Sequence, residues 1–365
     1  MARAFDRKLI LEDGSEYLGY GFGSHRSTIC EIVFETSMAG YQELVSDPSY
    51  TDQAVVMTYP LIGTYGIADE DFETRFPTIG GLIVSEYNDH PSNFRCTKTL
   101  SEIMEDYNIP GIEVTDTRAL ARHLRDNGSC RGMFTSVGMP KEEALELIRS
   151  TPAPTDAVQR VSCRKPWRSR TANHKFHVVV VDCGLKMSML RCLNERGCNL
   201  TVVPYNATAE QVLALKPDGL FITSGPGNPE NVRPVVELIH ALRGKMPIFG
   251  IDLGNLLIAL AYGATTYKMK AGHRGGNHPV RDLATSKIGM ASQSHDYAIV
   301  EESLAGTGLE VTHRDLIDNT VEGVRCAEDG VFGVQFHPEG APGPQDFINL
   351  FDNFIDLMKE DRHNA

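Results

Sequence analysis

The second half of the chain alternates short apolar runs with amphipathic segments, and this alternation is the strongest constraint on its fold. Four such pairs follow one another: KFHVVVVDCG with KMSMLRCLNERG, NLTVVPY with TAEQVLALK, GLFITSGPG with VVELIHALRG, and MPIFGI with LLIALAYG. Apolar runs without polar alternation are typical of parallel strands that are covered on both faces. The sequence therefore predicts an α/β fold over residues 174–365, with a mainly parallel sheet flanked by helices.

The first half has a different pattern, which predicts a separate N-terminal domain of mixed α/β structure at residues 1–150. Short apolar runs separated by turn signals such as LEDG and SDPSY predict strands. Residues 151–173 are rich in Pro, Ser, Thr and Arg and have no sustained period, so they predict an interdomain linker. A chain of 365 residues is long enough for two such domains.

One helix of the first half carries signals for both of its ends. The segment DTRALARHLRDNG, from Asp116 to Gly128, places Leu120 and Leu124 four residues apart on one face. Thr115 or Asp116 can serve as the N-cap, and Gly128 can supply a left-handed stop. We therefore expect an amphipathic helix that packs through its leucines.

Charge and composition exclude several classes of partner. The formal net charge is -13 and there is no long run of Lys and Arg, so we expect neither nucleic acid nor a membrane surface as a partner. The N-terminal sequence has no signal-peptide pattern and no apolar stretch reaches membrane-spanning length, so we expect a cytoplasmic protein. The eight cysteines include no C-x-x-C pair, which argues against a zinc or redox motif.

The stretch FGIDLGNLLIAL, from Phe249 to Leu260, predicts a buried strand, a turn with two glycines and an apolar helix. A G-x-X-x-G elbow of this kind holds residue X at a helix N-terminus, where backbone N–H groups can stabilise a nucleophile or an oxyanion. Such a position suits Ser or Cys. Here it holds Asp252, a residue that the helix N-terminus also favours but that has different chemistry.

Two further motifs fall at the ends of predicted strands, where ligands of parallel sheets bind. In SGPGNP, Gly225 and Gly227 remove side chains at a place where a ligand or an oxyanion would approach the backbone. The run GVFGVQFHPEG ends in His337 and Glu339, which lie two residues apart and so point the same way from an extended segment. A carboxylate in this position can orient an imidazole, as the third member of a catalytic triad does.

Together these three motifs resemble the class I glutamine amidotransferase domain. In that family a Cys at the elbow attacks the glutamine amide, and a His-x-Glu pair activates it. Four further segments resemble the small subunit of carbamoyl-phosphate synthetase in particular: residues 33–66, VFETSMAGYQELVSDPSYTDQAVVMTYPLIGTYG; DTRALARHLRDNG; residues 268–280, KMKAGHRGGNHPV; and residues 341–346, APGPQD. The resemblance covers nearly the whole chain, and its N-terminal half is the specific part.

The resemblance implies a function in a complex. In the family, the small subunit hydrolyses glutamine and passes ammonia to a large subunit, which makes carbamoyl phosphate from ammonia, bicarbonate and ATP for arginine and pyrimidine biosynthesis. A large subunit is therefore the expected partner, in a heterodimer. ATP and magnesium are expected on that subunit, and no cofactor is expected on this chain.

Six positions of the family site are intact here. By motif, Ser49, Gly225, Gly227 and Leu253 would bind glutamine or build the oxyanion site. His337 would be the base and Glu339 its orienting group.

The elbow itself departs from the family pattern G-x-C-x-G-H-Q. This sequence reads GIDLGNL, with Asp252 in place of the nucleophilic Cys, Asn255 in place of His, and Leu256 in place of the Gln that contacts glutamine. A second departure follows later in the chain. Where the family has Asn-His-Gly-aromatic against the amino-acid end of the substrate, this chain has SHDY, so that Ser294 and Asp296 differ.

Chemistry predicts what these changes cost. A carboxylate that expelled ammonia from an amide would form a high-energy anhydride, so Asp252 is a poor acyl-transfer nucleophile. Its charge would also repel an oxyanion and favour imidazolium at His337, which is not a base. Leu256 lies on the same helix face as Asp252 and offers no hydrogen bond to a substrate. The expected substrate contacts are completed by Ser294, Asp296 and Tyr297.

Three interpretations of Asp252 follow. The chain is a decayed glutaminase that still docks a large subunit supplied with free ammonia; or Asp252 is a nucleophile in another reaction, as in some α/β-hydrolases; or the chain is a scaffold or regulatory subunit of an ammonia-dependent synthetase. The second interpretation explains neither the His-x-Glu pair nor the N-terminal half. Several departures lie far from the elbow, which argues against one engineered substitution.

Two other sets of residues are expected to be structural. His273, Arg274 and His278 in GHRGGNHPV do not have the local spacing of a metal site, so we expect a loop and no metal. Cys183 ends a predicted strand, where it is either a reactive thiol or a small buried residue, and the sequence favours the latter.

Overall fold

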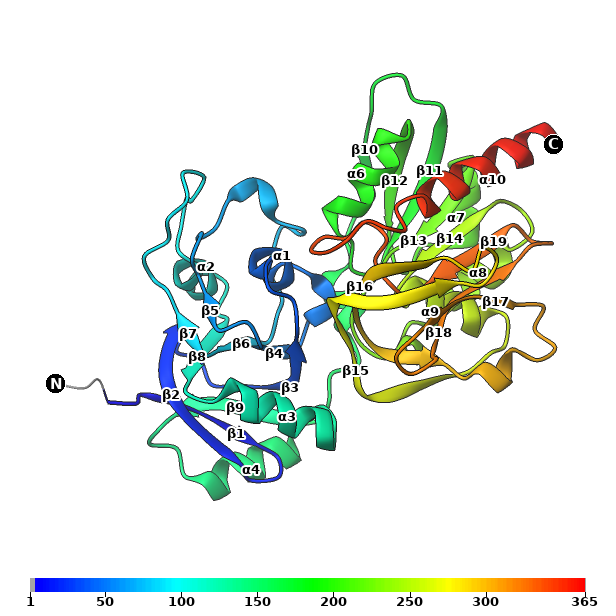
Figure 1. Ribbon diagram of the computed structural model, residues 1–365. Helices are drawn as coiled ribbons and strands as arrows, with labels where there is room; N and C mark the ends of the chain where they lie inside the picture. The colour runs from blue at the N-terminus through cyan, green and yellow to red at the C-terminus, as the bar shows by residue number, and fades with distance from the viewer. Residues whose placement is uncertain (1–3, 365) are drawn as a thin grey trace. The chain divides into compact units, whose positions relative to one another are not determined.

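The chain divides into two compact units, Met1–Pro154 and Thr155–Ala365, which are shown in Figure 1. The computed structural model describes residues 4–364. The two units have different architectures, and both combine strands with helices, as the sequence predicts. Within the described part of the chain, no helix has both the length and the apolar character needed to cross a membrane.

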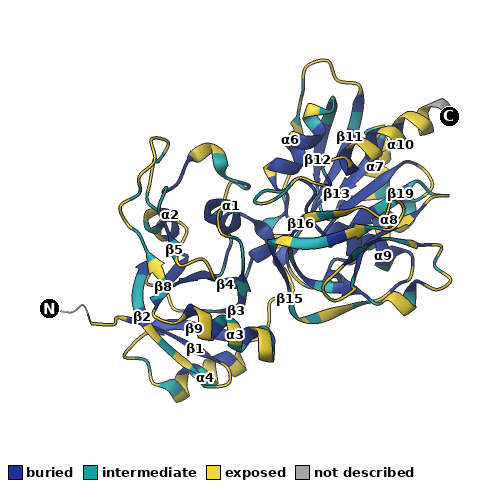
Figure 2. Ribbon diagram, in the orientation of Figure 1, coloured by how far each residue is buried: buried dark blue, intermediate teal, exposed yellow. Residues whose placement is uncertain are grey.

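The N-terminal unit is a closed barrel with the strand order β1-β2-β8-β6-β4-β3-β9. Its barrel strands are β1 (Arg7–Leu11), β2 (Glu16–Gly23), β3 (Thr28–Glu35), β4 (Gln53–Met57), β6 (Gly81–Val84), β8 (Pro110–Val114) and β9 (Cys130–Ser136). A separate pair joins β5 (Leu61–Ile62) to β7 (Glu86–Tyr87), and the helices are α1 (Tyr41–Val45), η1 (Pro48–Tyr50), η2 (Asp69–Asp71), α2 (Leu100–Asp106), α3 (Thr117–Asn127) and α4 (Lys141–Ser150). Strands β1, β4 and β6 are buried along their whole length, as Figure 2 shows for the barrel. The closed barrel leaves none of these strands with an unpaired edge.

Helix α3 confirms the helix predicted from its end signals. Asp116 is the N-cap, and its side chain accepts a hydrogen bond of 2.8 Å from the backbone N–H of Ala119. The helix ends at Asn127, and its C-cap Gly128 has φ 101° and ψ 169°, a conformation that favours glycine but is not the left-handed stop that the sequence predicts. Leu120 and Leu124 are buried in the barrel cluster, so the predicted apolar stripe is the packing face.

The C-terminal unit is built on a ten-stranded sheet with the order β10-β12-β11-β13-β14-β19-β18-β17-β15-β16. Its strands are β10 (Trp167–Ser169), β11 (Phe176–Asp182), β12 (Cys198–Pro204), β13 (Gly219–Ile222), β14 (Ile248–Ile251), β15 (Thr266–Asp282), β16 (Ile288–Ile299), β17 (Glu310–Asp315), β18 (Val321–Cys326) and β19 (Val331–Val334). The run from β12 to β19 is parallel, which confirms the predicted α/β fold. Beyond β19 the sheet continues in antiparallel strands.

Helices cover both faces of the parallel strands, which is why these strands are apolar throughout. Val179 and Val181 share one buried cluster with α7 (Ala209–Ala214), α8 (Arg233–Leu242) and α9 (Leu253–Ala261). The alternate residues of the same strand, Val178 and Val180, share the opposite cluster with α6 (Met187–Glu195) and α10 (Leu350–Asn364). The remaining helices of the unit are α5 (Ala157–Val161), η3 (Pro229–Asn231) and η4 (Glu301–Leu304).

The stretch predicted as a linker, residues 151–173, contains the short helix α5 and strand β10. Strand β10 pairs antiparallel with β12, and Trp167 lies opposite Val202. The structure places the division between the units at Pro154 and Thr155. The domain limits at 150 and 173 remain predictions from composition.

Replacing Asp116 with Ala should destabilise α3 by about 1 kcal/mol, because the Ala119 N–H then loses its capping acceptor. The measurement is hydrogen exchange of the α3 amides in the full chain. Arg122→Ala, an exposed change in the middle of the same helix, is the control and should stay within about 0.5 kcal/mol of the parent. Equal protection factors in the two variants would contradict the assigned cap.

Candidate active site

The predicted site residues of the C-terminal unit follow neighbouring parallel strands. Asp252 follows β14, the SGPG turn follows β13, and the segment with His337 follows β19. Strand β14 pairs with β13 on one side and with β19 on the other. The carboxyl ends of parallel strands meet at one edge of a sheet, so the fold brings these three motifs together, as the sequence predicts.

The turn at Asp252 is sharp and tightly packed. Asp252 has φ 54° and ψ -109°, which is rare for a residue with a side chain, and its N–H donates to Val334 O over 2.8 Å. Both flanking glycines are required by space. A Cβ on Gly250 would lie 2.6 Å from the backbone of Gly254, and one on Gly254 would lie 2.5 Å from Ile222 O. This is the geometry that a nucleophile elbow needs.

The Asp252 side chain is buried, with 3% exposure, and belongs to a chain of amide hydrogen bonds. Gln335 Nε2 donates to Asp252 Oδ1 over 2.9 Å, and Asn255 Nδ2 donates to Gln335 Oε1 over 3.0 Å. Asn255 thus orients the amide of Gln335, and that amide holds the carboxylate. The sequence analysis missed Gln335, although it lies two residues before His337 in an extended run and so shares a side with it.

His337 and Glu339 form the predicted pair. The Nδ1 atom of His337 lies 2.8 Å from Glu339 Oε1, and both side chains are fully buried. Lys186, which the sequence analysis also missed, places its ammonium 3.3 Å from the same carboxylate oxygen. Its Nζ also donates to Ala341 O over 2.6 Å. The sequence signal that could have found Lys186 is its position between the end of β11 and the start of α6, at the edge of the sheet where the other site residues lie.

Burial and neighbouring charges set the protonation of this pair. Burial and the Lys186 ammonium lower the pKa of His337, but the Glu339 carboxylate and Asp252 raise it more, so its pKa is raised overall. Burial raises the pKa of Glu339, yet His337 and Lys186 lower it to about 2. These shifts extend the pH range in which a charged imidazolium stands beside an ionised Glu339.

The sign of each shift gives the pH range in which the pair stabilises the fold. The raised pKa of His337 contributes stability that is complete below about pH 6.5, its ordinary value, and is lost as pH rises through the raised pKa. The lowered pKa of Glu339 contributes stability above about pH 4.3 that is lost as pH falls toward 2. The pair is thus most stabilising in mildly acidic solution.

Ser294 forms a hydrogen bond with the second ring nitrogen of His337. Its Oγ lies 2.9 Å from Nε2, and the two strands are tied by the bond from His337 N to Ser292 O of 2.8 Å. Ser294, His337 and Glu339 have the connectivity of a serine triad. In its charged form, which the raised pKa favours, the ring donates from both nitrogens and cannot take the proton of a hydroxyl.

The other predicted substrate contacts have defined environments. Leu253 and Leu256 are buried in the apolar cluster beneath α9, with 1% and 2% exposure. The Asp296 carboxylate is bound by the guanidinium of Arg274 on the neighbouring strand β15. The backbone oxygen of Tyr297 lies 2.9 Å from His295 Nδ1.

Gly225 is required by packing, and Gly227 is favoured by its backbone conformation. A Cβ on Gly225 would lie 2.2 Å from Cys183 O, and Gly227 has a φ of 86°. Ser49 lies in the N-terminal unit, where it is buried and its N–H donates to Asp47 Oδ1 over 2.8 Å. The expected contacts of these three residues with glutamine remain predictions.

Cys183 is not placed to act as a nucleophile. Its side chain is completely buried at the end of β11, and burial raises the pKa of its thiol well above the ordinary value. The thiolate is the reactive form of cysteine, so this residue is inert at neutral pH. The expectation of a small buried residue therefore agrees with its environment.

Comparisons with known proteins match both units. Residues 9–134 match the family described as carbamoyl-phosphate synthase small chain, CPSase domain, and residues 179–357 match glutamine amidotransferase class-I. The carbamoyl phosphate synthase small chain of Staphylococcus epidermidis is 50% identical over 354 residues, which are 97% of this chain and 96% of that protein. The corresponding protein of Bacillus caldolyticus is 49% identical over 354 residues, 97% of each chain.

Removing the Asp252 charge should lower the pKa of His337, because the carboxylate favours the imidazolium. The measurement is an NMR titration of the His337 ring nitrogens in the parent chain and in Asp252→Asn, a variant that keeps the side-chain shape. Asp356→Asn, an exposed change on α10, is the matched control and should leave the titration unchanged. A His337 pKa that is the same in all three proteins would contradict the assigned electrostatics.

Proposed function

This chain belongs to the family of carbamoyl-phosphate synthase small chains, and on that premise we propose that it retains the fold and the large-subunit partner of the family but has lost the hydrolysis of glutamine. The large subunit of such a complex would take free ammonia. Carbamoyl phosphate would then serve arginine and pyrimidine biosynthesis, with ATP and magnesium bound by the large subunit in the cytoplasm.

The observation that carries this proposal is the buried carboxylate of Asp252 at the elbow, held by the amide of Gln335. A thioester forms readily from a thiolate and an amide, and water then cleaves it. A carboxylate would have to form an anhydride instead, which is much higher in energy. The side chain at the one position built for attack is therefore a poor nucleophile.

Two further features oppose glutamine hydrolysis. An oxyanion formed beside Asp252 would be repelled, although the helix N-terminus at the elbow is suited to bind it. The base is also affected, because Glu339 and Asp252 raise the pKa of His337 and so favour its charged form, which cannot take a proton. Any nucleophile at this site would depend on these two contributions, stabilisation of the oxyanion and removal of a proton.

The substrate side of the site has changed as well. Leu256 offers only alkyl surface where the family pattern has a Gln, and an unpaired polar group of a bound substrate costs about 1–3 kcal/mol. Asp296 is neutralised by Arg274, so its carboxylate is engaged within the protein. Glutamine is thus expected to bind weakly, if its binding survives at all.

A scaffold or regulatory role is the alternative within the same family, because the N-terminal unit and most of the amidotransferase fold are preserved. The two roles differ in what the large subunit does alone. A large subunit that is stable and fully active with ammonium in the absence of this chain leaves no scaffold role. A large subunit that needs this chain for activity or solubility supports it.

Carbamoyl-phosphate synthesis by this chain with its cognate large subunit should proceed with ammonium as the only nitrogen source and fail with glutamine. The assay measures carbamoyl phosphate under each nitrogen source, and ATP turnover serves as the control for an active large subunit. Synthesis from glutamine would show that another group is the nucleophile and would refute the proposal.

The single change Asp252→Cys should not restore glutamine hydrolysis, because Leu256, Ser294 and Asp296 would remain. We expect glutamate release from glutamine to stay at background in this variant. The comparison is a variant that carries Asp252→Cys together with Asn255→His, Leu256→Gln, Ser294→Asn and Asp296→Gly, in which release should rise. Measurable turnover in the single variant would show that the thiol alone was missing.

A further inference from the structure

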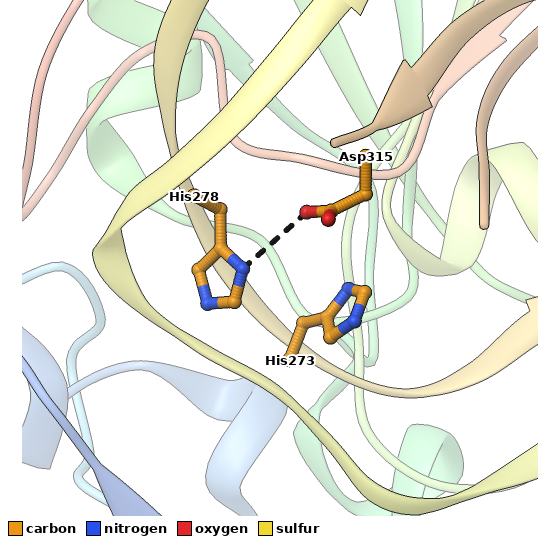
Figure 3. A group of neighbouring side chains, drawn as sticks. All are labelled: His273, His278 and Asp315. Atoms are coloured by element: carbon orange, nitrogen blue, oxygen red, sulfur yellow. Dashed lines mark ion pairs between the residues drawn. The ribbon is translucent and has the colours of Figure 1, made fainter. Parts of the chain in front are cut away.

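A buried cluster of histidines and carboxylates lies in the antiparallel part of the C-terminal sheet. Its core consists of His273 and His278 from β15 and Asp315 from the end of β17, shown in Figure 3. The donor atoms of these three side chains all lie within 4.8 Å of one another. His273 and Asp315 are buried, with exposures of 8% and 0%.

An irregularity of β15 turns the two histidines to the same side. Residues five apart in a regular strand point to opposite faces. Between His273 and His278, however, β15 advances five residues while its partner β16 advances only four, from His295 to Ala291. The extra residue is a β-bulge, a feature that re-aims side chains and recurs beside functional sites.

Strand pairing brings the carboxylate to the same place. Asp315 is opposite Val280, which lies two residues after His278 and so shares its face. Directly opposed residues of an antiparallel pair project on one side of the sheet. His278 Nδ1 and Asp315 Oδ2 lie 3.5 Å apart, and in Figure 3 they point toward one another.

The atoms that face one another make no hydrogen bond. Among the described residues, the buried side-chain atoms without a hydrogen-bond partner include His273 Nδ1, His278 Nδ1 and Asp315 Oδ2. Buried polar atoms are normally satisfied, so three such atoms in one cluster are unusual. Two imidazole nitrogens and a carboxylate oxygen are also the ligands that zinc prefers.

We propose that His273, His278 and Asp315 bind a divalent transition-metal ion, with Zn²⁺ the best match to their chemistry. Zinc bonds of about 2.0–2.2 Å in a tetrahedron place ligand atoms about 3.4 Å apart. The 3.5 Å between His278 and Asp315 already fits, and His273 would close the remaining gap. The ion would connect β15 to β17 and so fix the bulged segment that carries Arg274.

The surroundings of His273 support ligation through Nδ1. Its other nitrogen, Nε2, lies 2.9 Å from Asp318 Oδ2. An imidazole that binds a metal commonly donates its second N–H to a carboxylate, which fixes the tautomer and strengthens the ligand. Glu322 Oε1 lies 3.4 Å from His273 Nδ1 and adds negative charge next to the ion.

An overlapping set, His273 with His295 and Glu322, fits a metal less well. Both ring nitrogens of His295 already have partners at 2.9 Å, the backbone oxygen of Tyr297 and Gln293 Oε1. Glu322 Oε2 accepts from Gln293 Nε2 over 3.2 Å, and Glu322 Oε1 accepts from Thr320 Oγ1 over 3.3 Å. These ligand atoms are hydrogen-bonded, whereas the nitrogens of the proposed site have only ion-pair contacts of 3.4 and 3.5 Å without a hydrogen bond.

The competing arrangement has a proton in place of the metal. His273 Nε2 lies 2.9 Å from Asp318 Oδ2 and its Nδ1 lies 3.4 Å from Glu322 Oε1, so in a metal-free cluster a proton on each nitrogen would face a carboxylate. Metal binding would release the Nδ1 proton to solvent as the Nδ1–metal bond forms. The two arrangements make opposite predictions for metal binding by the intact chain.

The test is titration of the chelator-treated, full-length chain with Zn²⁺ by calorimetry and with Co²⁺ by visible absorption. We expect one high-affinity site, with the Co²⁺ bands of a low-symmetry site and no thiolate charge-transfer band. His278→Gln and Asp315→Asn should each weaken binding by more than about 100-fold, and Asp318→Asn by about 10–100-fold, as for an outer hydrogen-bond partner. His240→Gln, which removes an exposed histidine on α8, is the matched control and should bind as the parent does.

The variants are chosen so that loss of binding is not loss of folding. Asp315→Asn keeps the oxygen that accepts from Ile317 N, and His278 is only partly buried. Circular dichroism checks that each variant is folded. Absence of a high-affinity site in the parent, a thiolate band with Co²⁺, or parental affinity in both ligand variants would each overturn the proposal.

Discussion

Close backbone packing at the start of α9 determines what position 252 can do. Gly254 lies against the carbonyl of Ile222, and Gly250 lies against Gly254, so neither position tolerates a side chain. The chain therefore has to turn at Asp252, in a backbone conformation that costs about 1–3 kcal/mol for a residue other than glycine. The fold forms this strained turn with a carboxylate on it, so the geometry of the elbow does not depend on a Ser or Cys at that position.

The charges around the elbow form one connected system. Glu339 is shared between His337 and Lys186, and Asp252 adds a second carboxylate whose charge acts on the imidazole. Buried charges are tolerated only when they are paired and hydrogen-bonded, and here the two cations lie next to the acids that need them. The consequence is that the carboxylates at this site favour the charged form of His337 over the neutral base.

Local patterns predicted the parts of this structure that depend on nearby residues. Helix α3 has the predicted cap and leucine stripe, the parallel strands follow the apolar runs, and His337 meets Glu339 as their spacing indicates. Lys186 and Gln335 were missed because each acts on a residue that is distant in sequence. For both, sequence alone gives the position but not the partner.

The prediction of a loop at His273 and His278 was wrong, because both residues lie on strand β15, and their side-chain arrangement was missed for a similar reason. Their spacing of five residues is not that of a metal-binding helix, and in a regular strand it would separate them. The bulge that unites them is visible only once β15 is aligned with β16, and the carboxylate comes from a third strand. A sequence motif cannot predict a cluster of side chains when their positions are set by a register shift between strands and not by their spacing in the sequence.

The hydrogen bonds that run from Asn255 through Gln335 to Asp252 also bear on which substitutions the elbow can accept. A thiol at position 252 accepts hydrogen bonds weakly, so the buried amide of Gln335 would lose its acceptor, at a cost of about 1–3 kcal/mol. That is a large part of the stability of a typical protein, about 5–15 kcal/mol. A thiol introduced alone at position 252 would therefore lower the stability of the protein before it supplied any chemistry. The hydrogen-bonded side chains of Asn255, Gln335 and Asp252 thus form a barrier to single substitutions at the elbow, because a change at one member leaves the next without its partner.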